Sequence, residues 1–230
     1  MNEPILLIPG MMCDARLFAP QIAVFSGSRP VMVVPLRGQA SFELFATEIL
    51  SHAPPQFALA GLSMGGIAAM EIIRQAPGRV TRLALMDTNP LAELPERAAE
   101  RKLQIERVRK GGLRLVMRDE MKPNYLTDGP NKQMLLDLCM TMAEDLGAKV
   151  FEEQSLALQR RRDQSDTLRG IDVPTLVLCG EDDRLCPVER HEMMCDLIPG
   201  ARLSVISNAG HLPVLEQPEL TNKVMEEWLS

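Results

Sequence analysis

The sequence predicts an α/β protein with a mostly parallel, doubly wound sheet and an all-helical insertion after the fourth strand. Short, continuously apolar runs alternate with helical stretches over the first 90 residues, and this alternation resumes after residue 170. Strands of a parallel sheet have helices on both faces, so they appear in a sequence as unbroken apolar runs. Between the two parts, residues 91–169 contain no strand-like run and carry a higher density of charge.

Six apolar runs have the length of buried strands, four before the insertion and two after it. They cover residues 4–8, 31–34, 56–60, 83–86, 174–179 and 203–206. Pro9-Gly10 ends the first run and Pro35 the second, and proline cannot donate the hydrogen bond that a strand would need there. Gly61, Asp87 and Gly180 follow three of the others. Each run is therefore expected to form one strand of a single sheet.

Helices are expected between these strands. Ser41 is a suitable N-cap for a helix that extends to Ser51, because its hydroxyl can accept a hydrogen bond from a free amide of the first turn. A second helix is expected over residues 64–75, and two more follow the insertion over residues 188–198 and 218–229. Repeated strand–helix–strand units connect parallel strands by right-handed crossovers, which predicts a doubly wound sheet.

The insertion is expected to form roughly four helices, with breaks where glycine and proline gather. The breaks are placed at Gly111-Gly112, at residues 122–124 and at residues 127–130. This pattern predicts two domains. They are a core domain of residues 1–90 and 170–230, and a helical cap, or lid, of residues 91–169 inserted into it.

Charge argues against nucleic acid as a partner. The chain carries a net charge of −6, and a protein that binds a phosphate backbone needs a face rich in Lys and Arg to replace its counterions. The one dense basic run, Arg160-Arg161-Arg162, lies beside Asp163 and Asp166 and is expected to be a solvated helix face.

The cysteines and histidines indicate neither a disulfide framework nor a metal centre. Five cysteines are scattered without C-x-x-C spacing, which fits reduced thiols in a cytoplasmic protein. Three histidines leave little room for a multi-histidine metal site. The apolar stretch over residues 4–12 lacks a basic segment before it and is too short to cross a bilayer. No membrane partner, metal or cofactor is therefore expected.

A G-x-S-x-G motif follows the third predicted strand. It consists of Gly61-Leu62-Ser63-Met64-Gly65 and leads into the next expected helix. A turn this tight holds the serine in strained backbone angles, and only glycine two residues before and two after it avoids a collision. The serine hydroxyl then stands clear of the sheet and faces the positive end of the helix. Ser63 is therefore the predicted nucleophile.

A serine hydroxyl needs a general base, and the chain has three histidines. His211 follows the last predicted strand, and the carboxyl-end loops of a parallel sheet gather at the edge where Ser63 also lies. His52 ends a helix far along the chain from these loops, and His191 is expected on a solvated helix face among charged neighbours. His211 is therefore the predicted base.

The base in turn needs a carboxylate that fixes its tautomer and stabilises its cation. Asp182 and Asp183 both follow the fifth predicted strand, at the same edge of the sheet, and either fits the order Ser, Asp, His along the chain. The residues alone leave the choice between these two open. Asp87, after the fourth strand, is the third candidate and is interpreted as a loop residue that caps local backbone amides.

Two backbone amides are predicted to stabilise the oxyanion of a tetrahedral intermediate. One is that of Met64, directly after the nucleophile, and the other is that of Met11, which follows the flexible Gly10 in the loop after the first strand. Gly10 and Met12 are the predicted pocket residues of this loop. Met11, Met12 and Met64 would surround Ser63 with adaptable apolar side chains, although core packing explains these methionines equally well.

At this point the chain resembles the α/β-hydrolase superfamily over nearly its whole length. The matching segments are Ile8-Pro9-Gly10, GLSMGG at 61–66, GEDD at 180–183 and NAGH at 208–211. The resemblance implies the α/β-hydrolase fold, a cap domain formed by the insertion, and Asp183 as the catalytic acid, three residues after Gly180. The chain is similar to small capped carboxylesterases of the pimeloyl-carrier-protein methyl-esterase kind. It differs in that Pro9 stands at the position of a usual histidine, and no antiparallel hairpin is expected before the first parallel strand.

The expected function is hydrolysis of a carboxylic ester, with thioesters and lactones included, through an acyl-enzyme on Ser63. Two alternatives stay open. The same three side chains could transfer protons in C–C bond cleavage or elimination, or the fold could serve a ligand-binding protein without catalysis. The expected partner is a small-molecule ester, and neither its identity nor the oligomeric state follows from the sequence.

Overall fold

The computed structural model describes residues 2–230 and contains one six-stranded parallel sheet. Its strands are β1 (Ile5–Ile8), β2 (Val31–Val33), β3 (Phe57–Leu62), β4 (Val80–Met86), β5 (Thr175–Gly180) and β6 (Arg202–Ile206). They lie in the order β2-β1-β3-β4-β5-β6, and every neighbouring pair is parallel. The order reverses between β1 and β3, as in a doubly wound sheet, so the predicted fold class is confirmed.

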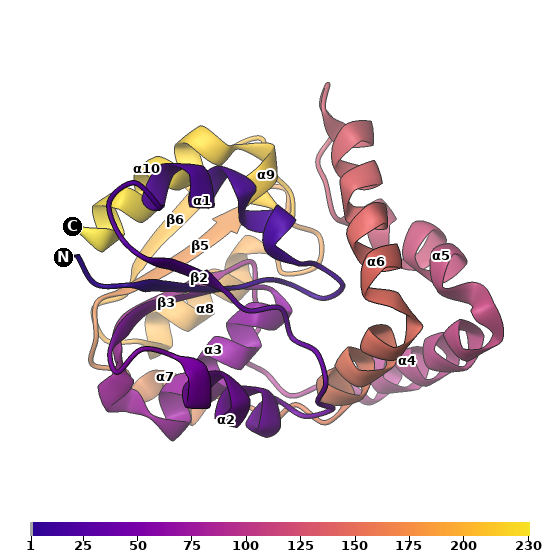
Figure 1. Ribbon diagram of the computed structural model, residues 1–230, viewed down its shortest axis with the longest axis horizontal. Helices are drawn as coiled ribbons and strands as arrows, with labels where there is room; N and C mark the ends of the chain where they lie inside the picture. The colour runs from indigo at the N-terminus through magenta and orange to yellow at the C-terminus, as the bar shows by residue number, and fades with distance from the viewer. Residues whose placement is uncertain (1) are drawn as a thin grey trace.

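Helices cover both faces of this sheet (Figure 1). One face carries α1 (Ala19–Phe25), α9 (Pro213–Glu216) and α10 (Pro218–Leu229), and the other carries α2 (Phe42–His52), α3 (Met64–Gln75) and α8 (Val188–Leu197). Two apolar clusters, one on each face of the sheet, form the core. Both faces of the sheet are therefore buried, which explains the unbroken apolar runs of the sequence.

The bounds of the observed helices agree with the expected bounds to within one residue for α2, α3 and α8. Ser41 caps α2 by accepting a hydrogen bond from the amide of Leu44, as its position in the sequence predicts. Helix α3 has the expected bounds, and α8 ends one residue early. The helical stretch at Ala15–Phe25 was not expected. It is divided between a 3₁₀ turn and α1, and α1 has only 7 residues, fewer than any of the helices expected between the strands.

The insertion consists of helices separated by glycine- and proline-containing turns. Helix α4 (Pro95–Arg107) continues through π-helical turns and α5 (Leu113–Leu115) to residue 121, with Gly111 in a left-handed conformation at φ 89°. After a 3₁₀ turn (Lys122–Asn124) and a loop comes α6 (Lys132–Gln159). The expected breaks are present. One more, at Gly147 with φ 80°, bends α6 and was not expected, because a single glycine also occurs within unbroken helices.

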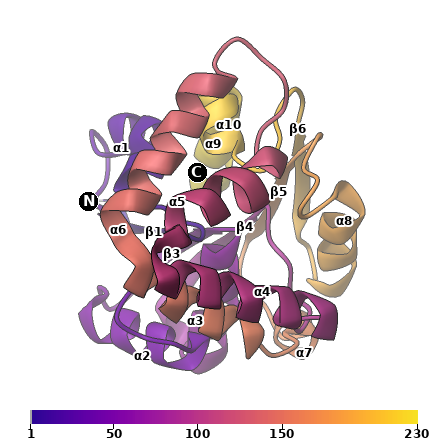
Figure 2. The same ribbon diagram turned by 90° about the vertical axis from the view of Figure 1, so that its right-hand side faces the viewer.

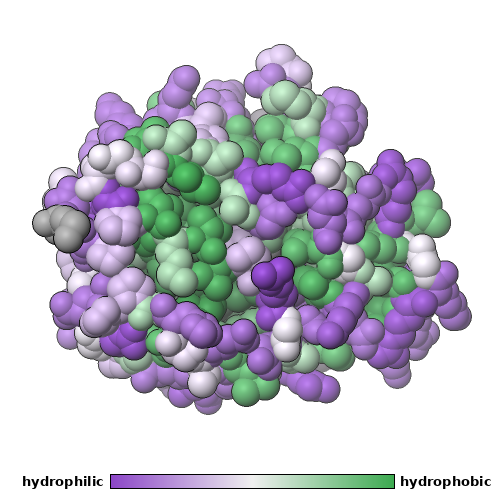
Figure 3. Space-filling view, viewed as in Figure 1, coloured by the Kyte–Doolittle hydropathy of each residue, from purple (hydrophilic) through white to green (hydrophobic). Residues whose placement is uncertain are grey.

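Most of the insertion stands beyond the carboxyl ends of the strands (Figures 1 and 2). Helices α4 and α6 pack against each other there, whereas α7 (Ser165–Arg169) packs on α3 and α8 beside the sheet. The edge of the sheet at β2 has a different character. Between α1 and α2, Figure 3 shows an apolar surface where the edge strand β2 lies, and Met32, Val33, Phe45 and Ile49 line a groove in that region.

Candidate active site

Ser63 lies at the sharp turn between β3 and α3. Its backbone adopts φ 56° and ψ −115°, a left-handed conformation that is strained for a residue with a side chain. A Cβ atom at Gly61 would lie 2.2 Å from the carbonyl oxygen of Gly65, and one at Gly65 would lie 2.0 Å from that of Ile8. Glycine is therefore required on both sides of Ser63, for the reason that the motif predicts.

Three hydrogen bonds fix this strained turn. The amide of Ser63 donates to the carbonyl oxygen of Met86 at the end of β4 (2.8 Å), and the hydroxyl of Thr88 donates to the carbonyl oxygen of Ser63 (2.7 Å). The amide of Gly66 returns to the same Ser63 carbonyl at 2.9 Å. The surrounding structure thus holds the serine in a conformation that it would not adopt alone.

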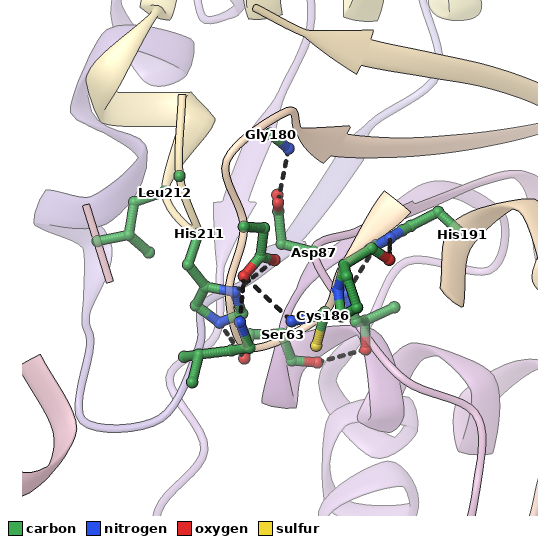
Figure 4. A network of polar contacts seen from close by, with 12 residues as sticks. Ser63, Asp87, Gly180, Cys186, His191, His211 and Leu212 are labelled. Carbon is green, nitrogen blue, oxygen red and sulfur yellow. Dashed lines mark hydrogen bonds and ion pairs between the residues drawn. The ribbon is translucent and has the colours of Figure 1, made fainter. Parts of the chain in front are cut away.

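A continuous hydrogen-bond chain joins Ser63, His211 and Asp183 (Figure 4). His211 Nε2 lies 2.9 Å from Ser63 Oγ, and His211 Nδ1 lies 2.8 Å from Asp183 Oδ2. The histidine and the aspartate are 3% and 4% exposed, so bulk water competes little for these bonds. With Nδ1–H donating to the carboxylate, Nε2 is free to accept the serine proton.

Asp183, and not Asp182, contacts the histidine. The second oxygen of Asp183, Oδ1, accepts hydrogen bonds from the amides of Leu185 (2.8 Å) and Cys186 (3.1 Å). Burial opposes the charged form, but His211 and these amides outweigh it and lower the pKa of Asp183. Asp182 is exposed and accepts a hydrogen bond from the hydroxyl of Thr127 instead. Of the two candidates that the sequence left open, Asp183 is the one with the contact that a catalytic acid needs.

Asp87 lies beside Asp183 and does not have the local capping role expected of it. It is fully buried, and its Oδ1 accepts a hydrogen bond from the amide of Gly180 on the neighbouring strand at 2.9 Å, so it does not cap local amides. Its Oδ2 has no hydrogen-bond partner among the described residues. Burial, and then the negative charge of Asp183, raise the pKa of Asp87 well above its ordinary value, which favours the neutral acid.

His191 is also placed differently from the expectation. Its side chain is fully buried rather than solvated, and its Nε2 accepts a hydrogen bond from the amide of Thr88 at 3.1 Å. Burial lowers the pKa of His191 to about 4, so the ring is neutral at pH 7. The charged neighbours of His191 in the sequence misled the interpretation, because they occupy the outer side of α8 while the histidine occupies its inner side.

The loop that carries His211 is held by residues that have no sequence signal of their own. The backbone amide of His211 donates a hydrogen bond to the carbonyl oxygen of Tyr125 in the insertion (2.7 Å). The Tyr125 ring packs edge-on against the imidazole of His211, with the two ring centroids 5.5 Å apart. Glu216 accepts hydrogen bonds from the amides of Gly210 and Leu212 at 3.0 Å and from Thr127 at 2.8 Å. The contacts of Tyr125 with His211 and of Glu216 with Thr127 join distant parts of the chain, so no local pattern could have predicted them.

The loop after β1 approaches the nucleophile as expected, but only part of it faces the cavity. Met11 and Met64 line the cavity beside Ser63. Met12 is fully buried at φ 55°, and its amide donates to Gln154 Oε1 of α6 (2.8 Å). Neither Gly10 nor Met12 lines the cavity, so the structure does not place the two predicted pocket residues in the pocket wall.

The cavity itself has a volume of about 500 Å³ and lies between the strand ends and the insertion. Its floor includes Ser63 and His211, and the insertion contributes a charged wall that includes Glu93, Arg101 and Arg161. Arg161 belongs to the basic run that was expected to be solvated. That expectation is wrong for this residue, because α6 ends at Gln159 and the chain then turns inward, which leaves the Arg161 side chain only 10% exposed.

One group of three potential metal ligands gathers among residues 2–230, namely Asp183, Cys186 and His211. Its chemistry fits the hydrogen-bonded pair better than a cation. Asp183 and His211 are bonded to each other, and burial raises the pKa of the Cys186 thiol well above its ordinary value, so the thiolate that a metal would need is disfavoured. Among the described helices, none has the length and apolar character to span a bilayer.

Comparison with known proteins identifies the family and its relatives. Residues 5–224 match the model of the alpha/beta hydrolase family. A pimeloyl-[acyl-carrier protein] methyl ester esterase of Legionella pneumophila (strain Corby) is 25% identical, with 98% of this chain and 95% of that protein aligned. A protein of Bacillus subtilis provisionally named a 2-succinyl-6-hydroxy-2,4-cyclohexadiene-1-carboxylate synthase is 29% identical over 75% of this chain and 65% of its own length.

Solved structures extend the likeness to the whole chain. A thermophilic esterase from Thermogutta terrifontis superposes with a TM-score of 0.90 and 29% identity, covering 100% of this chain and 90% of that one. The enol-lactonase from Burkholderia xenovorans superposes with a TM-score of 0.89 at 21% identity, covering 100% and 92%, which shows the shared fold. The family match over residues 5–224, together with this fold, establishes that the chain belongs to the α/β-hydrolase family.

Proposed function

We propose that this protein hydrolyses a carboxylic ester, with Ser63 as nucleophile, His211 as general base and acid, and Asp183 as the residue that orients and stabilises the histidine. The observation that carries the proposal is the hydrogen-bond chain of 2.9 Å and 2.8 Å that joins the three side chains at the floor of the cavity. The likeness to proteins named as esterases supports ester chemistry, with thioesters and lactones as related substrates.

The proposed reaction has two halves. His211 Nε2 accepts the Ser63 proton as Oγ attacks the ester carbonyl, and Asp183 stabilises the imidazolium that forms. The tetrahedral intermediate collapses when His211 returns the proton to the alkoxide leaving group, which departs as the alcohol. A water molecule then gives its proton to His211 and attacks the acyl-enzyme, and the acid leaves as Ser63 recovers its proton.

The oxyanion needs two donors that are in place before the reaction. We assign these to the amides of Met64, the first residue of α3, and of Met11, in the loop after β1. Both residues line the cavity beside Ser63, and the strained turn presents the serine to the positive end of α3. No cofactor takes part in this proposal.

The insertion is proposed to act as the cap of this site, over a core domain formed by residues 1–90 and 170–230. Its segment at Tyr125–Thr127 holds the His211 loop, and its residues form one wall of the cavity. The proposed partner is a small-molecule ester. All five cysteines are free thiols, which fits the cytoplasmic location expected from the sequence.

The Bacillus subtilis relative is named as a synthase and not as an esterase, which favours a second candidate, in which the same three side chains transfer protons in C–C bond cleavage or elimination. The two functions differ in what they require of Ser63. Only ester hydrolysis through an acyl-enzyme needs the serine as a nucleophile, whereas a proton-transfer reaction can retain activity without a covalent intermediate.

Steady-state and pre-steady-state kinetics on short-chain p-nitrophenyl esters test the proposal. The intact protein is expected to turn over the ester with a burst of p-nitrophenol, and Ser63→Ala and His211→Ala variants are expected to lose turnover by roughly 10⁴-fold or more. Ester turnover that survives in Ser63→Ala would overturn the acyl-enzyme. Activity of Ser63→Ala on an enol or diketone substrate, without ester turnover by the intact protein, would favour the second candidate.

A further inference from the structure

The cavity wall formed by the insertion contains two guanidinium groups that share one carboxylate. Arg101 Nε lies 2.8 Å from Glu93 Oε2, and Arg161 Nη2 lies 3.0 Å from Glu93 Oε1. The three side chains are largely removed from water, with Glu93 4% exposed, Arg161 10% and Arg101 20%. We call them the Glu93 cluster. It carries one more positive charge than negative, and that charge lies inside the cavity that also contains Ser63 and His211.

Arg161 is the incompletely satisfied member of the Glu93 cluster. Its Nε is buried and has no hydrogen-bond partner among the described residues. Burial disfavours its charge, Glu93 supports it, and the nearby Arg101 and Arg190 oppose it, with the net result that the pKa of Arg161 is lowered. A buried cation is costly unless an anion compensates it fully. The protein alone therefore leaves Arg161 short of an acceptor.

The other charges that face the cavity do not supply that acceptor. Glu100 forms an ion pair with Arg97 at 3.1 Å. Glu120 forms an ion pair with Arg107, which does not line the cavity. Arg190, a further lining residue, has as its described polar contact the Asn89 side chain, at 3.5 Å. The polar groups of this wall are thus short of negative charge, and a ligand with an anionic group would complete them.

A purely structural role explains the Glu93 cluster less well. Arg101 alone already joins Glu93 to α4 through an ion pair, so neutralisation of Glu93 does not require Arg161. A second buried arginine adds desolvation cost and an unmatched donor, which a structural link would not need. The same features are useful if the arginine binds an anion that is present only when the substrate is bound.

We propose that the substrate is an ester that also carries a free carboxylate, and that Arg161, supported by Arg101, binds this carboxylate while Ser63 attacks the ester. This inference rests on the proposed ester hydrolysis and adds its substrate class. A guanidinium matches a carboxylate in a planar, two-pronged geometry, and the Glu93 cluster supplies one uncompensated positive charge, which one carboxylate balances. Half-esters of aliphatic dicarboxylic acids have this chemistry.

Binding without turnover is the first test. In a Ser63→Ala background, monomethyl adipate is titrated by calorimetry against the protein, against an added Arg161→Gln substitution and against an added Arg162→Gln substitution, whose arginine is exposed. We expect saturable binding that weakens by roughly tenfold or more with Arg161→Gln and is unchanged with Arg162→Gln. Methyl hexanoate, the uncharged counterpart, is expected to bind more weakly than the half-ester.

Kinetics with an active Ser63 provide the second test. The ratio of kcat/KM for monomethyl adipate to kcat/KM for methyl hexanoate is expected to exceed about 10 in the intact protein and to fall by roughly tenfold in Arg161→Gln. Arg161→Lys, which keeps the charge but loses the two-pronged geometry, is expected to recover part of the ratio. Thermal unfolding of each variant shows whether the substitution perturbs folding, and the ratio is independent of the amount of folded enzyme.

Three outcomes would overturn the inference. They are an equal preference for both esters, a ratio that Arg161→Gln leaves unchanged, and tighter Arg161-dependent binding of inorganic phosphate than of the half-ester. Failure of the proposed function has a different signature, because a protein that binds the half-ester through Arg161 but turns over neither ester would retain the carboxylate site and lack the esterase activity.

Discussion

The two walls of the cavity differ in how the sequence specifies them. On the sheet side, Ser63, Asp183 and His211 each follow a parallel strand at its carboxyl end, and the fold itself brings them together. On the insertion side, Glu93, Arg101 and Arg161 come from a loop, a helix and the chain after a helix, and belong to no motif. The sheet side carries the proposed chemistry, which depends on fixed local geometry. The insertion side carries the proposed recognition, which depends on packing between distant segments.

The largest expected effect tests the sheet side. Asp183→Asn keeps the acceptor for the amides of Leu185 and Cys186 but cannot stabilise an imidazolium, so kcat on a p-nitrophenyl ester is expected to fall on the order of 10⁴-fold. Asp182→Asn is the matched control, because Asp182 contacts Thr127 instead of the histidine, and its kcat is expected to stay within about threefold of the unaltered protein. Equal losses in the two variants would contradict the assignment of Asp183.

A smaller expected effect, on stability, comes from His191, which contacts the sheet side of the cavity through its hydrogen bond to the amide of Thr88. Its folded-state pKa of about 4 lies under the ordinary value of 6.5. The neutral ring therefore contributes stability that is fully present above pH 6.5 and is lost as pH falls from 6.5 toward 4, by about 3 kcal/mol in total. Urea unfolding across this range measures the loss.

The control for that measurement is His191→Gln, whose side-chain oxygen can still accept the Thr88 amide but does not titrate. We expect the free energy of unfolding of this variant to depend less steeply on pH between 6.5 and 4 than that of the unaltered protein. Parallel pH profiles for the two proteins would show that His191 is not held neutral by the fold.

The contact between the two walls gives the next effect in size. Gln154 of α6 accepts the Met12 amide at 2.8 Å and donates to the carbonyl oxygen of Leu36 at 2.6 Å, so it joins the insertion to the loop after β1. Gln154→Leu leaves both buried backbone groups unpaired, and we expect it to lower the free energy of unfolding by about 1–3 kcal/mol. Because the same loop carries the Met11 amide, kcat is expected to fall by roughly tenfold.

Gln133 offers a control on the same helix, since it is exposed. Gln133→Leu is expected to change neither stability nor kcat beyond about twofold or 0.5 kcal/mol. If Gln154→Leu lost stability without losing kcat, the loop after β1 would be independent of the insertion, and the two walls would be less closely connected than the hydrogen bonds indicate.

The smallest expected effect concerns Asp87. Its folded-state pKa is raised, so the neutral acid contributes stability that is present below the ordinary pKa of 3.8 and is lost as pH rises through the folded-state value. Asp87→Asn keeps the acceptor for the Gly180 amide and cannot ionise. Relative to the unaltered protein, we expect it to gain stability as pH rises from 5 to 8, by about 1 kcal/mol, because only the unaltered protein then loses stability through ionisation of Asp87 in the unfolded chain. Greater destabilisation at pH 8 than at pH 5 would show that the Asp87 carboxylate is needed.

How much the sequence could predict follows the same division. The strand runs, the glycine-flanked Ser63 and the position of His211 after the last strand are local features, and each fixes its structure through sterics or through the shared edge of a parallel sheet. Asp183 could be separated from Asp182 only by resemblance, because both follow the same strand, and the structure separates them by the partner each one contacts.

The expectations that failed depend on long-range packing. His191 and Arg161 both have charged neighbours in the sequence, and both are buried, because the fold turns one side of α8 and the end of α6 inward. Tyr125, Gln154 and Glu216 support the site through hydrogen bonds to the backbone of remote segments, at His211, Met12 and Thr127 respectively. Such bonds place no demand on the sequence near either partner, so only the assembled structure shows them.

Covalent labelling of Ser63 tests the central claim most directly. The protein is treated with a fluorophosphonate, which phosphonylates an activated serine, and the modified peptide is identified by mass spectrometry, with Ser63→Ala and His211→Ala treated in parallel. We predict a single modification, on Ser63, that is absent from the first variant and at least about 100-fold slower in the second. An intact protein that is not labelled, or that is labelled at another residue, would contradict the proposal that Ser63, His211 and Asp183 act together as a catalytic unit.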